Sequence, residues 1–143
     1  MSADSAASNE RSLRVLVYSD DRTTRDKVKF GIGKRPERDL PNVEFVECAT
    51  HHAVIQQLDD GGIDVAILDG EAVPAGGMGL ARQLKDEIYQ CPPILVLTGR
   101  VQDAWLATWS RAEAVVPHPI DPIALVKAFV GLARSRRAAQ PAS

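Results

Sequence analysis

The stretch Asp64-Val-Ala-Ile-Leu-Asp69 and the glycine-rich segment after it, Gly70-Glu-Ala-Val-Pro-Ala-Gly-Gly-Met-Gly79, decide the fold. The apolar run is too short for a helix, and it closes on an acid followed by glycine, a pattern typical of a buried strand that ends in a turn. In open α/β sheets, ligands bind beyond the carboxyl ends of the strands. The stretch therefore predicts a parallel strand that brings the carboxylate of Asp69 to the functional edge of a sheet.

A second apolar run, Leu13 to Tyr18, also ends in polar residues, Ser19, Asp20 and Asp21. Two neighbouring strands that end in acids could place oxygen ligands around Mg²⁺, which favours one or two carboxylates plus waters. The alternative is that these acids only cap the helices that follow, because Asp is favoured at helix N-caps. The residues alone leave both interpretations open.

The composition predicts one domain. The chain has 143 residues, of which 45% are hydrophobic, and a net charge of -2, which argues against a protein that works by neutralising nucleic-acid phosphates. Cys48 and Cys91 show no metal-ligand or redox spacing, which favours a reducing cytoplasm. No apolar run approaches the ~18 to 20 residues that span a bilayer, and the N-terminus does not resemble a signal peptide.

Strands and helices are expected to alternate along the whole chain. Hydrophobic periodicity and turn residues predict helices at about 22–30, 51–60, 80–88, 103–109 and 121–132. Further strands are expected at 43–47, 94–97 and 114–116, the first of them at a sheet edge because its residues alternate between apolar and charged. We expect a disordered tail over 1–11, a domain over 12–132 and a flexible Ala/Arg-rich tail over 133–143.

This pattern resembles the receiver domain of bacterial two-component response regulators. The residues that carry the resemblance are Val15 to Asp21 with Arg25, Asp64 to Asp69, Pro93 to Gly99, and His118-Pro119 where the family has Lys-Pro. It implies a flavodoxin-like, doubly wound (βα)5 fold with a five-stranded parallel sheet in the order 2-1-3-4-5. It also implies a phospho-acceptor at Asp69 and a switching hydroxyl at Thr98.

The same resemblance implies a Mg²⁺ site that is incomplete in this chain. Its ligands fall on the carboxylates of Asp20 and Asp69 and on the backbone carbonyl of Glu71. Ser19 stands where the family has a second acid, and Asp21 is a doubtful substitute for it. We therefore expect weak Mg²⁺ binding and no tightly bound cofactor.

Two further departures concern the phosphorylation switch. His118 replaces the lysine that pairs with the acceptor and then with the phosphoryl group, and imidazole, with an ordinary pKa of ~6.5, is not a permanent cation. Val115 replaces the aromatic residue whose rotamer follows the threonine. We expect a cis His118-Pro119 bond and an imidazole that points toward Asp69.

These changes favour an atypical stand-alone receiver that is impaired in phosphorylation and acts by docking to a protein, rather than an enzyme. Trp105 and Trp109, four residues apart on the expected fourth helix, are candidates for the docking surface, although either could instead fill the core. The alternative is a working receiver that takes a phosphoryl group from a histidine kinase onto Asp69 with Mg²⁺. A nucleotide- or flavin-binding domain is disfavoured, because no GxGxxG follows the first strand.

The chain also looks similar to stand-alone receiver-like proteins of actinobacteria, some of which are suspected of associating with the proton-pumping NADH dehydrogenase. The resemblance thus suggests two candidate partners, a large respiratory complex and a histidine kinase, without direct nucleic-acid binding or membrane insertion. The expected location is cytoplasmic, or peripheral on the cytoplasmic side of a membrane complex.

Overall fold

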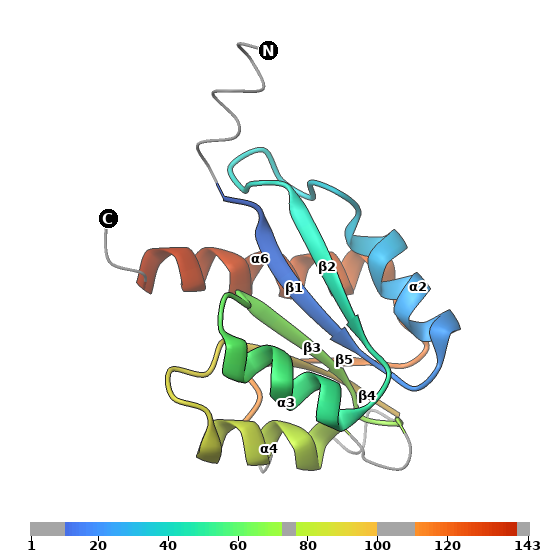
Figure 1. Cartoon of the computed structure of the whole chain (residues 1–143). Coiled ribbons are helices and arrows are strands. Elements are labelled where there is room, and N and C mark those ends of the chain that lie inside the picture. The colour runs from blue at the N-terminus through green and yellow to red at the C-terminus, as the bar shows by residue number, and fades with distance from the viewer. Residues whose placement is uncertain (1–10, 73–76, 100–110, 140–143) are drawn as a thin grey trace.

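A computed structural model describes residues 11–72, 77–99 and 111–139. Its centre is a parallel five-stranded sheet in the order β2-β1-β3-β4-β5 (Figure 1). This is the fold class and strand order expected from the sequence. The strands are β1 (Leu13–Tyr18), β2 (Val43–Cys48), β3 (Val65–Asp69), β4 (Ile94–Thr98) and β5 (Ala114–Pro117).

Helices cover both faces of the sheet, as Figure 1 shows. Helices α2 (Arg22–Ile32) and α6 (Pro122–Ala139) lie on one face, and α3 (His51–Asp60) and α4 (Gly77–Glu87) lie on the other. Alternate residues of a strand therefore point into two different apolar cores. Val15 and Val17 pack with Phe129 on the α2–α6 side. Leu16 packs with Leu84 on the α3–α4 side.

Position in the sheet explains the sequence pattern of each strand. All residues of β3 and of β4 are buried, because helices cover both faces of these inner strands, and both read as continuous apolar runs. Strand β2 lies at the sheet edge and leaves Glu44 and Glu47 exposed between apolar residues. The predicted edge strand is therefore confirmed.

Side-chain caps fix the start of two helices. Asp21 caps α2 by accepting a hydrogen bond from the Thr23 N–H, and Thr50 caps α3 by accepting one from the Ala53 N–H. Gly33 ends α2 with a φ of 73°, in the left-handed region that glycine tolerates best. The turns that follow β1 and β2 are thus fixed by side-chain hydrogen bonds to the helices that come next.

The expectation of a flexible tail over 133–143 is wrong for residues 133–139. Helix α6 continues to Ala139 instead of ending near residue 132, and Ala133 is fully buried in the core. Arg134, the next residue, forms a bidentate pair with Asp39, at 2.8 and 2.9 Å. Alanine and arginine are strong helix formers, and cations favour a helix C-terminus, so the composition that suggested a tail suits a helix here.

At the other terminus, residues 1–10 of the expected tail lie outside the described residues. Arg11 is described and contacts the buried carboxylate of Asp64 at 3.3 Å. Among the described helices, none is both long and apolar enough to cross a membrane.

Candidate functional site

The carboxyl ends of the two inner strands β3 and β4 and of the outer strand β5 meet at one end of the sheet. Asp69 ends β3, Thr98 ends β4 beside it, and the strand register pairs Asp69 with Leu97 and Thr98 with Pro117. His118 follows β5 directly, and its backbone N–H donates to the Thr98 carbonyl at 2.7 Å. Asp69 and Thr98 are both buried. The structure therefore brings together the three residues predicted for phosphoryl chemistry.

The Asp69 carboxylate is hydrogen-bonded at both oxygens. The Ser19 hydroxyl donates to Oδ2 at 2.8 Å. The Glu71 backbone N–H donates to Oδ1 at 2.9 Å, and His118 Nε2 lies 3.2 Å from the same oxygen. Only 5% of the Asp69 side chain is exposed. The acceptor position is thus buried and held by partners from three different loops.

Ser19 has a larger role than the sequence indicated. It is fully buried, its Oγ accepts a hydrogen bond from the Asp21 N–H at 3.0 Å, and its carbonyl accepts one from Arg25 Nη1 at 2.6 Å. The replacement of an acid by serine was visible in the sequence. Its consequence was not, because the hydrogen bond to Asp69 depends on the approach of two strand ends that are 50 positions apart.

The Arg25 side chain is held in place by a charge network. Its Nε lies 3.1 Å from Glu47, whose other oxygen contacts Lys29 at 2.8 Å. The Lys29 hydrogen bond, assisted by Arg25, lowers the pKa of the Glu47 carboxyl. With one end bound to Glu47 and the other to the Ser19 carbonyl, Arg25 positions the turn that carries Ser19.

His118 confirms two predictions. The His118-Pro119 peptide bond is cis, and the imidazole points from the end of β5 toward Asp69. The ring is partly open to solvent, with 26% of the side chain exposed. Val115, in the place of the family's aromatic residue, is half-buried in β5.

The predicted magnesium ligands are only partly assembled. Asp20 is exposed at the end of β1, whereas both oxygens of Asp21 serve the start of α2 through Thr23 and Thr24. Within the ranges that the structure describes, no three His, Cys, Asp or Glu side chains are grouped as a metal site. The set that remains for Mg²⁺ is the Asp20 and Asp69 carboxylates and the Glu71 carbonyl.

The acids at this edge also act on a neighbouring tyrosine. Burial raises the pKa of Tyr18, and the charges of Asp20 and Asp69 raise it further. The Tyr18 phenol therefore stays protonated at neutral pH and adds no charge to the site.

The side chain of Glu71 was not anticipated as part of the site. Its carboxylate lies against the main chain of Gly99, the residue after Thr98, in the space that a side chain at position 99 would fill. Close by, the Gly70 N–H donates to the Leu97 carbonyl at 2.7 Å, so the ends of β3 and β4 are in direct contact. Glu71 thus touches Asp69 through its N–H and Gly99 through its carboxylate.

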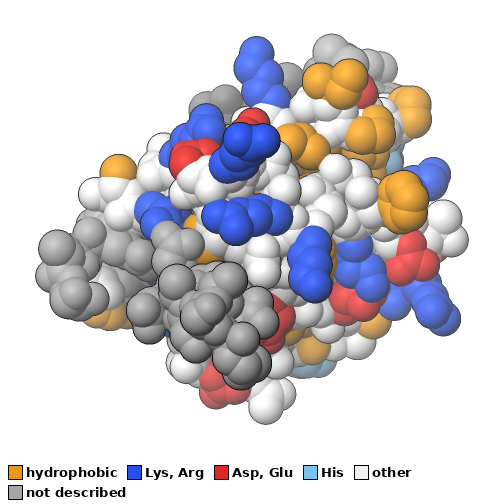
Figure 2. Space-filling view, turned by 90° about the horizontal axis from the view of Figure 1, so that it is seen from above, with side chains coloured by type: hydrophobic (Ala, Val, Ile, Leu, Met, Phe, Trp, Pro, Cys, Tyr) orange, Lys and Arg blue, Asp and Glu red, His pale blue; other side chains and the backbone are white. Residues whose placement is uncertain are grey.

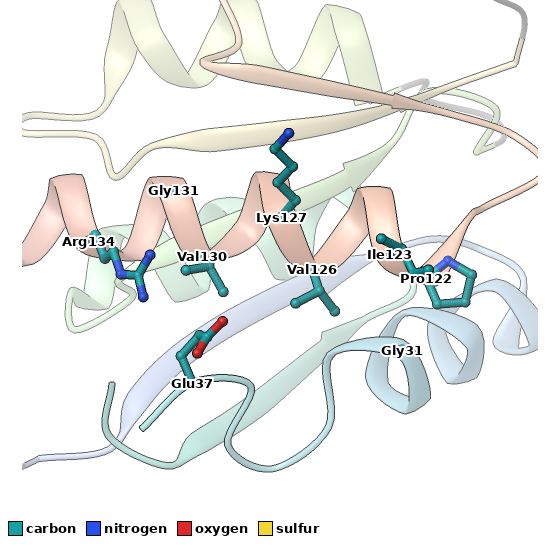
Figure 3. Close-up of a pocket in the computed structure, with 9 residues that line it drawn as sticks. All are labelled: Gly31, Glu37, Pro122, Ile123, Val126, Lys127, Val130, Gly131 and Arg134. Carbon is teal, nitrogen blue, oxygen red and sulfur yellow. The ribbon is translucent and has the colours of Figure 1, made fainter. Parts of the chain in front are cut away.

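A separate feature is an apolar groove between α2 and α6. Its floor and walls include Gly31, Ile123, Val126 and Val130, drawn in Figure 3. Ile123, in the lining, is 79% exposed, and Phe30, beside the groove, is 92% exposed. In Figure 2, which views the molecule from the side where β1 begins, hydrophobic side chains gather along one border and Lys and Arg side chains occupy the centre.

The predicted docking residues Trp105 and Trp109 lie outside the described residues.

Comparison with solved structures agrees with the fold. The chain superposes on a response regulator receiver domain from Clostridium thermocellum with a TM-score of 0.72 and 21% identity, covering 90% of this chain and 99% of that one. For a LuxR-family two-component response regulator from Aurantimonas sp. SI85-9A1, the TM-score is 0.73 at 21% identity, covering 88% of each chain. The BeF3-activated receiver domain of DrrB gives 0.67 at 17% identity, covering 87% and 99%.

The sequence comparisons find relatives of much higher identity than these solved structures. No family model matches it. It is 61% identical over 124 residues to proteins described as uncharacterized response regulatory proteins in two strains of Mycobacterium tuberculosis, CDC 1551 / Oshkosh and H37Rv. The alignments cover 87% of this chain and 93% of each relative. Together with the sheet order and the Asp69 site, this identity shows that the chain belongs to the response regulator family and has the fold of its receiver domain.

Proposed function

We propose that this chain is an atypical receiver that acts by binding a protein partner and is impaired in phosphoryl transfer to Asp69. The observation that carries the proposal is the hydrogen bond from Ser19 to Asp69 Oδ2. The Ser19 hydroxyl donates one hydrogen bond to Asp69. A carboxylate at position 19 would instead have been a negatively charged ligand for a metal ion. The site stabilises the unphosphorylated aspartate and lacks part of the machinery for modifying it.

The chemistry at stake is a balanced transfer. One Asp69 oxygen attacks the phosphorus of a donor such as acetyl phosphate, a P–O bond forms to Asp69, and the bond to the departing acetate breaks. Positive charge must balance the transferring phosphoryl group, and Mg²⁺ and a basic side chain supply it in phosphoryl-transfer sites. Here the metal set has lost one carboxylate, and the basic side chain is the imidazole of His118, 3.2 Å from Oδ1. Both changes reduce the positive charge that is available to stabilise the transferring phosphoryl group.

Incubation with acetyl phosphate and Mg²⁺, followed by intact mass measurement, tests this proposal. We expect only a small fraction of the protein to gain ~80 Da, the mass of one phosphoryl group. Asp69→Asn is the matched control, because it keeps the shape of the side chain and removes the nucleophile. Stoichiometric labelling that Asp69→Asn abolishes would overturn the proposal.

That outcome would support the second candidate, a working receiver phosphorylated by a histidine kinase. The specific observation in its favour is that Asp69 and Thr98 remain buried side by side at the ends of β3 and β4. Asp20 also remains exposed at the same edge, where it could reach a metal. The labelling experiment separates the two candidates directly.

For the docking surface, we propose the α2–α6 groove, with an amphipathic helix of a partner protein as its occupant. Its apolar lining suits the apolar face of such a helix. An acidic residue on the flank of that helix would complement Lys127, which lines the groove from α6; the other charged residues of the lining are Glu37 and Arg134, and Arg134 already pairs with Asp39. Helices from a large membrane complex, including a respiratory NADH dehydrogenase, or from a histidine kinase are the candidates to test.

A photo-crosslinking residue at position 123, compared with one at position 89, tests this surface in membrane and cytosolic fractions. Tyr89 is the matched control because it is 87% exposed, as an apolar residue on another part of the surface. We expect position 123 to label one partner peptide that forms an acidic amphipathic helix. Equal labelling from position 89, or labelling of a second copy of the chain, would contradict the proposal.

A further inference from the structure

We propose that the end of the sheet at which β1 and β2 begin carries a basic face that binds an anionic lipid bilayer surface. The basic face consists of Lys34, Arg35 and Arg38 in the loop between α2 and β2 and of Arg134 and Arg137 in α6. It lies at the opposite end of the strands from the acceptor site, so the inference goes beyond the proposed function. The protein lies on the bilayer without inserting into it.

Backbone contacts hold the loop at this end of the sheet. The Val43 N–H, at the start of β2, donates to the Lys34 carbonyl at 2.7 Å. The Leu13 N–H, at the start of β1, donates to the Asn42 carbonyl at 2.8 Å. Between these two contacts, Leu40 is buried in the α2–α6 core. The loop therefore presents its charged side chains from a fixed position beside the first residues of two strands.

Helix α6 reaches the same loop through its arginines. Arg134 binds both carboxylate oxygens of Asp39, at 2.8 and 2.9 Å. These hydrogen bonds lower the pKa of the Asp39 carboxyl, and the charge of Arg137 lowers it further. Asp39 is thus compensated by α6 and does not offset the cations of the loop. Figure 2 looks onto this end of the molecule, where Lys and Arg side chains occupy the centre.

The loop cations have no acid of their own. Lys34, Arg35 and Arg38 are exposed, and within the described ranges none of them forms an ion pair. The Arg35 guanidinium donates to the Arg38 carbonyl at 2.8 Å, which leaves the net charge of both residues in place. Glu37 is the acid nearest in sequence, and its charge acts on Arg134, whose pKa it helps to raise.

Two further acids at this end already have partners. Glu44 in β2 lies 3.7 Å from Arg14, and Asp64 before β3 lies 3.3 Å from Arg11. Pairs of this kind cancel their own charges and leave the charge of the loop unchanged. The local potential at the basic face is therefore positive, although the chain as a whole has a net charge of -2.

The opposite end of the strands is acidic. Asp20, Asp21, Glu71 and Asp121 are exposed there, after the ends of β1, β3 and β5. A planar anionic surface acts on the whole charge distribution, so it attracts the basic face and repels the acidic end. The protein is thereby oriented with its acceptor site turned away from the bilayer, where a soluble partner can reach it.

The form of the cations favours a bilayer over a compact acidic ligand. Lys34, Arg35 and Arg38 have long, exposed side chains without a fixed acceptor. A bilayer offers many anionic headgroups at no fixed position, and basic side chains near its surface each contribute to binding without needing a shaped site. The basic face thus supplies weak, oriented attachment to an anionic membrane surface.

Purified full-length protein and lipid vesicles test this inference. Lys34→Ala/Arg38→Ala removes two cations and keeps the backbone carbonyls of both residues, which accept the hydrogen bonds that hold the loop. Arg22→Ala/Lys27→Ala is the matched control, because it removes the same charge from two exposed residues of α2 outside the basic face. The probe is phosphatidylcholine vesicles with about one third phosphatidylserine, beside pure phosphatidylcholine vesicles.

Co-sedimentation at low ionic strength measures the bound fraction. We expect the wild type to bind the phosphatidylserine vesicles and not pure phosphatidylcholine, and to be released at ~1 M salt, where the Debye length is only ~3 Å. Lys34→Ala/Arg38→Ala should bind about tenfold or more weakly, because each basic residue near an anionic leaflet contributes about a factor of five. The control variant should bind like the wild type.

Three results would overturn the inference. They are no binding of the wild type to phosphatidylserine vesicles at low ionic strength, equal binding by folded Lys34→Ala/Arg38→Ala, and tighter binding to duplex DNA than to the vesicles, which would assign the basic face to nucleic acid. Circular dichroism checks the fold of each variant. Acetyl phosphate labelling is a separate readout, so failure of this inference leaves impaired phosphoryl transfer standing, and the converse also holds.

Discussion

The Ser19 hydroxyl donates a hydrogen bond of 2.8 Å to Asp69 Oδ2, and both residues are buried at the edge of the sheet. This contact joins the end of β1 to the end of β3. It replaces the repulsion between two neighbouring carboxylates with an attractive contact that needs no metal. The unmodified acceptor site is therefore a stable arrangement.

Ser19→Asp should make the stability of the fold depend on Mg²⁺. A carboxylate at this buried position would lie beside Asp69, and like charges in one buried site destabilise each other. We expect the variant to melt several degrees below the wild type without Mg²⁺ and to recover most of the loss in millimolar Mg²⁺, as ligand binding to the folded state requires.

Thermal unfolding with and without Mg²⁺ measures this effect, with Ser19→Ala as the control. Ser19→Ala also loses the hydrogen bond, but it adds no charge, so its melting temperature should not respond to Mg²⁺. A Ser19→Asp variant that is equally insensitive to Mg²⁺ would show that the metal site cannot be rebuilt at this position.

Strand periodicity predicted the strands and the acid at the end of β3, because these patterns are local, whereas the resemblance to receiver domains implied the sheet order and the meeting of Asp69, Thr98 and His118. The sequence could not predict the Glu71 contact with Gly99, which depends on how two turns approach each other in space. It also misplaced the end of α6. Ala133 looked like part of a tail, and only the packing of α6 against the sheet shows that it is buried.

Truncation after Leu132 should therefore destabilise the protein. It removes the buried methyl group of Ala133 and the Arg134 pair with Asp39, and it shortens the last turns of α6. We expect a lower urea midpoint and a loss of about 1–3 kcal/mol, typical of a change that removes buried contacts. Truncation after Ala139 is the control, and equal midpoints for both truncated chains would contradict this account of α6.

Two phenylalanines provide a matched test of the core. Phe129 is fully buried under the sheet, whereas Phe30 is 92% exposed beside the groove. Phe129→Ala should cost about 3–5 kcal/mol of unfolding free energy, because it leaves a cavity. Phe30→Ala should change it by less than about 0.5 kcal/mol. Denaturant unfolding measures both, and similar costs for the two variants would show that the α2–α6 core is assigned wrongly.

Cys48 should resist alkylation in the folded protein. Burial raises the pKa of its thiol from 9.0 to about 11, and the reactive thiolate is correspondingly scarce at pH 8. Because the folded pKa lies above the unfolded one, the neutral thiol contributes its full stability below pH 9. That contribution is lost as the pH rises toward 11.

Iodoacetamide labelling between pH 7 and 11, resolved by peptide mass spectrometry, measures the thiol directly. The folded protein should label at Cys48 only at the alkaline end of this range. In the urea-unfolded chain, the labelling rate should rise with pH with a midpoint near 9. Rapid labelling of Cys48 in the folded protein at pH 8 would be incompatible with its burial beside β1.

The measurement that tests the central claim most directly is acetyl phosphate labelling of the wild type beside Ser19→Asp/His118→Lys. The double variant restores both the missing carboxylate and the permanent cation near Asp69, while the rest of the site is unchanged. Intact mass gives the phosphorylated fraction, and Asp69→Asn in both backgrounds identifies the modified residue. We predict little labelling of the wild type and a gain of about tenfold or more in rate for the double variant, or ~1.4 kcal/mol of barrier. A wild type that is labelled as fast and as fully as the double variant would contradict the claim that Ser19 and His118 impair phosphoryl transfer.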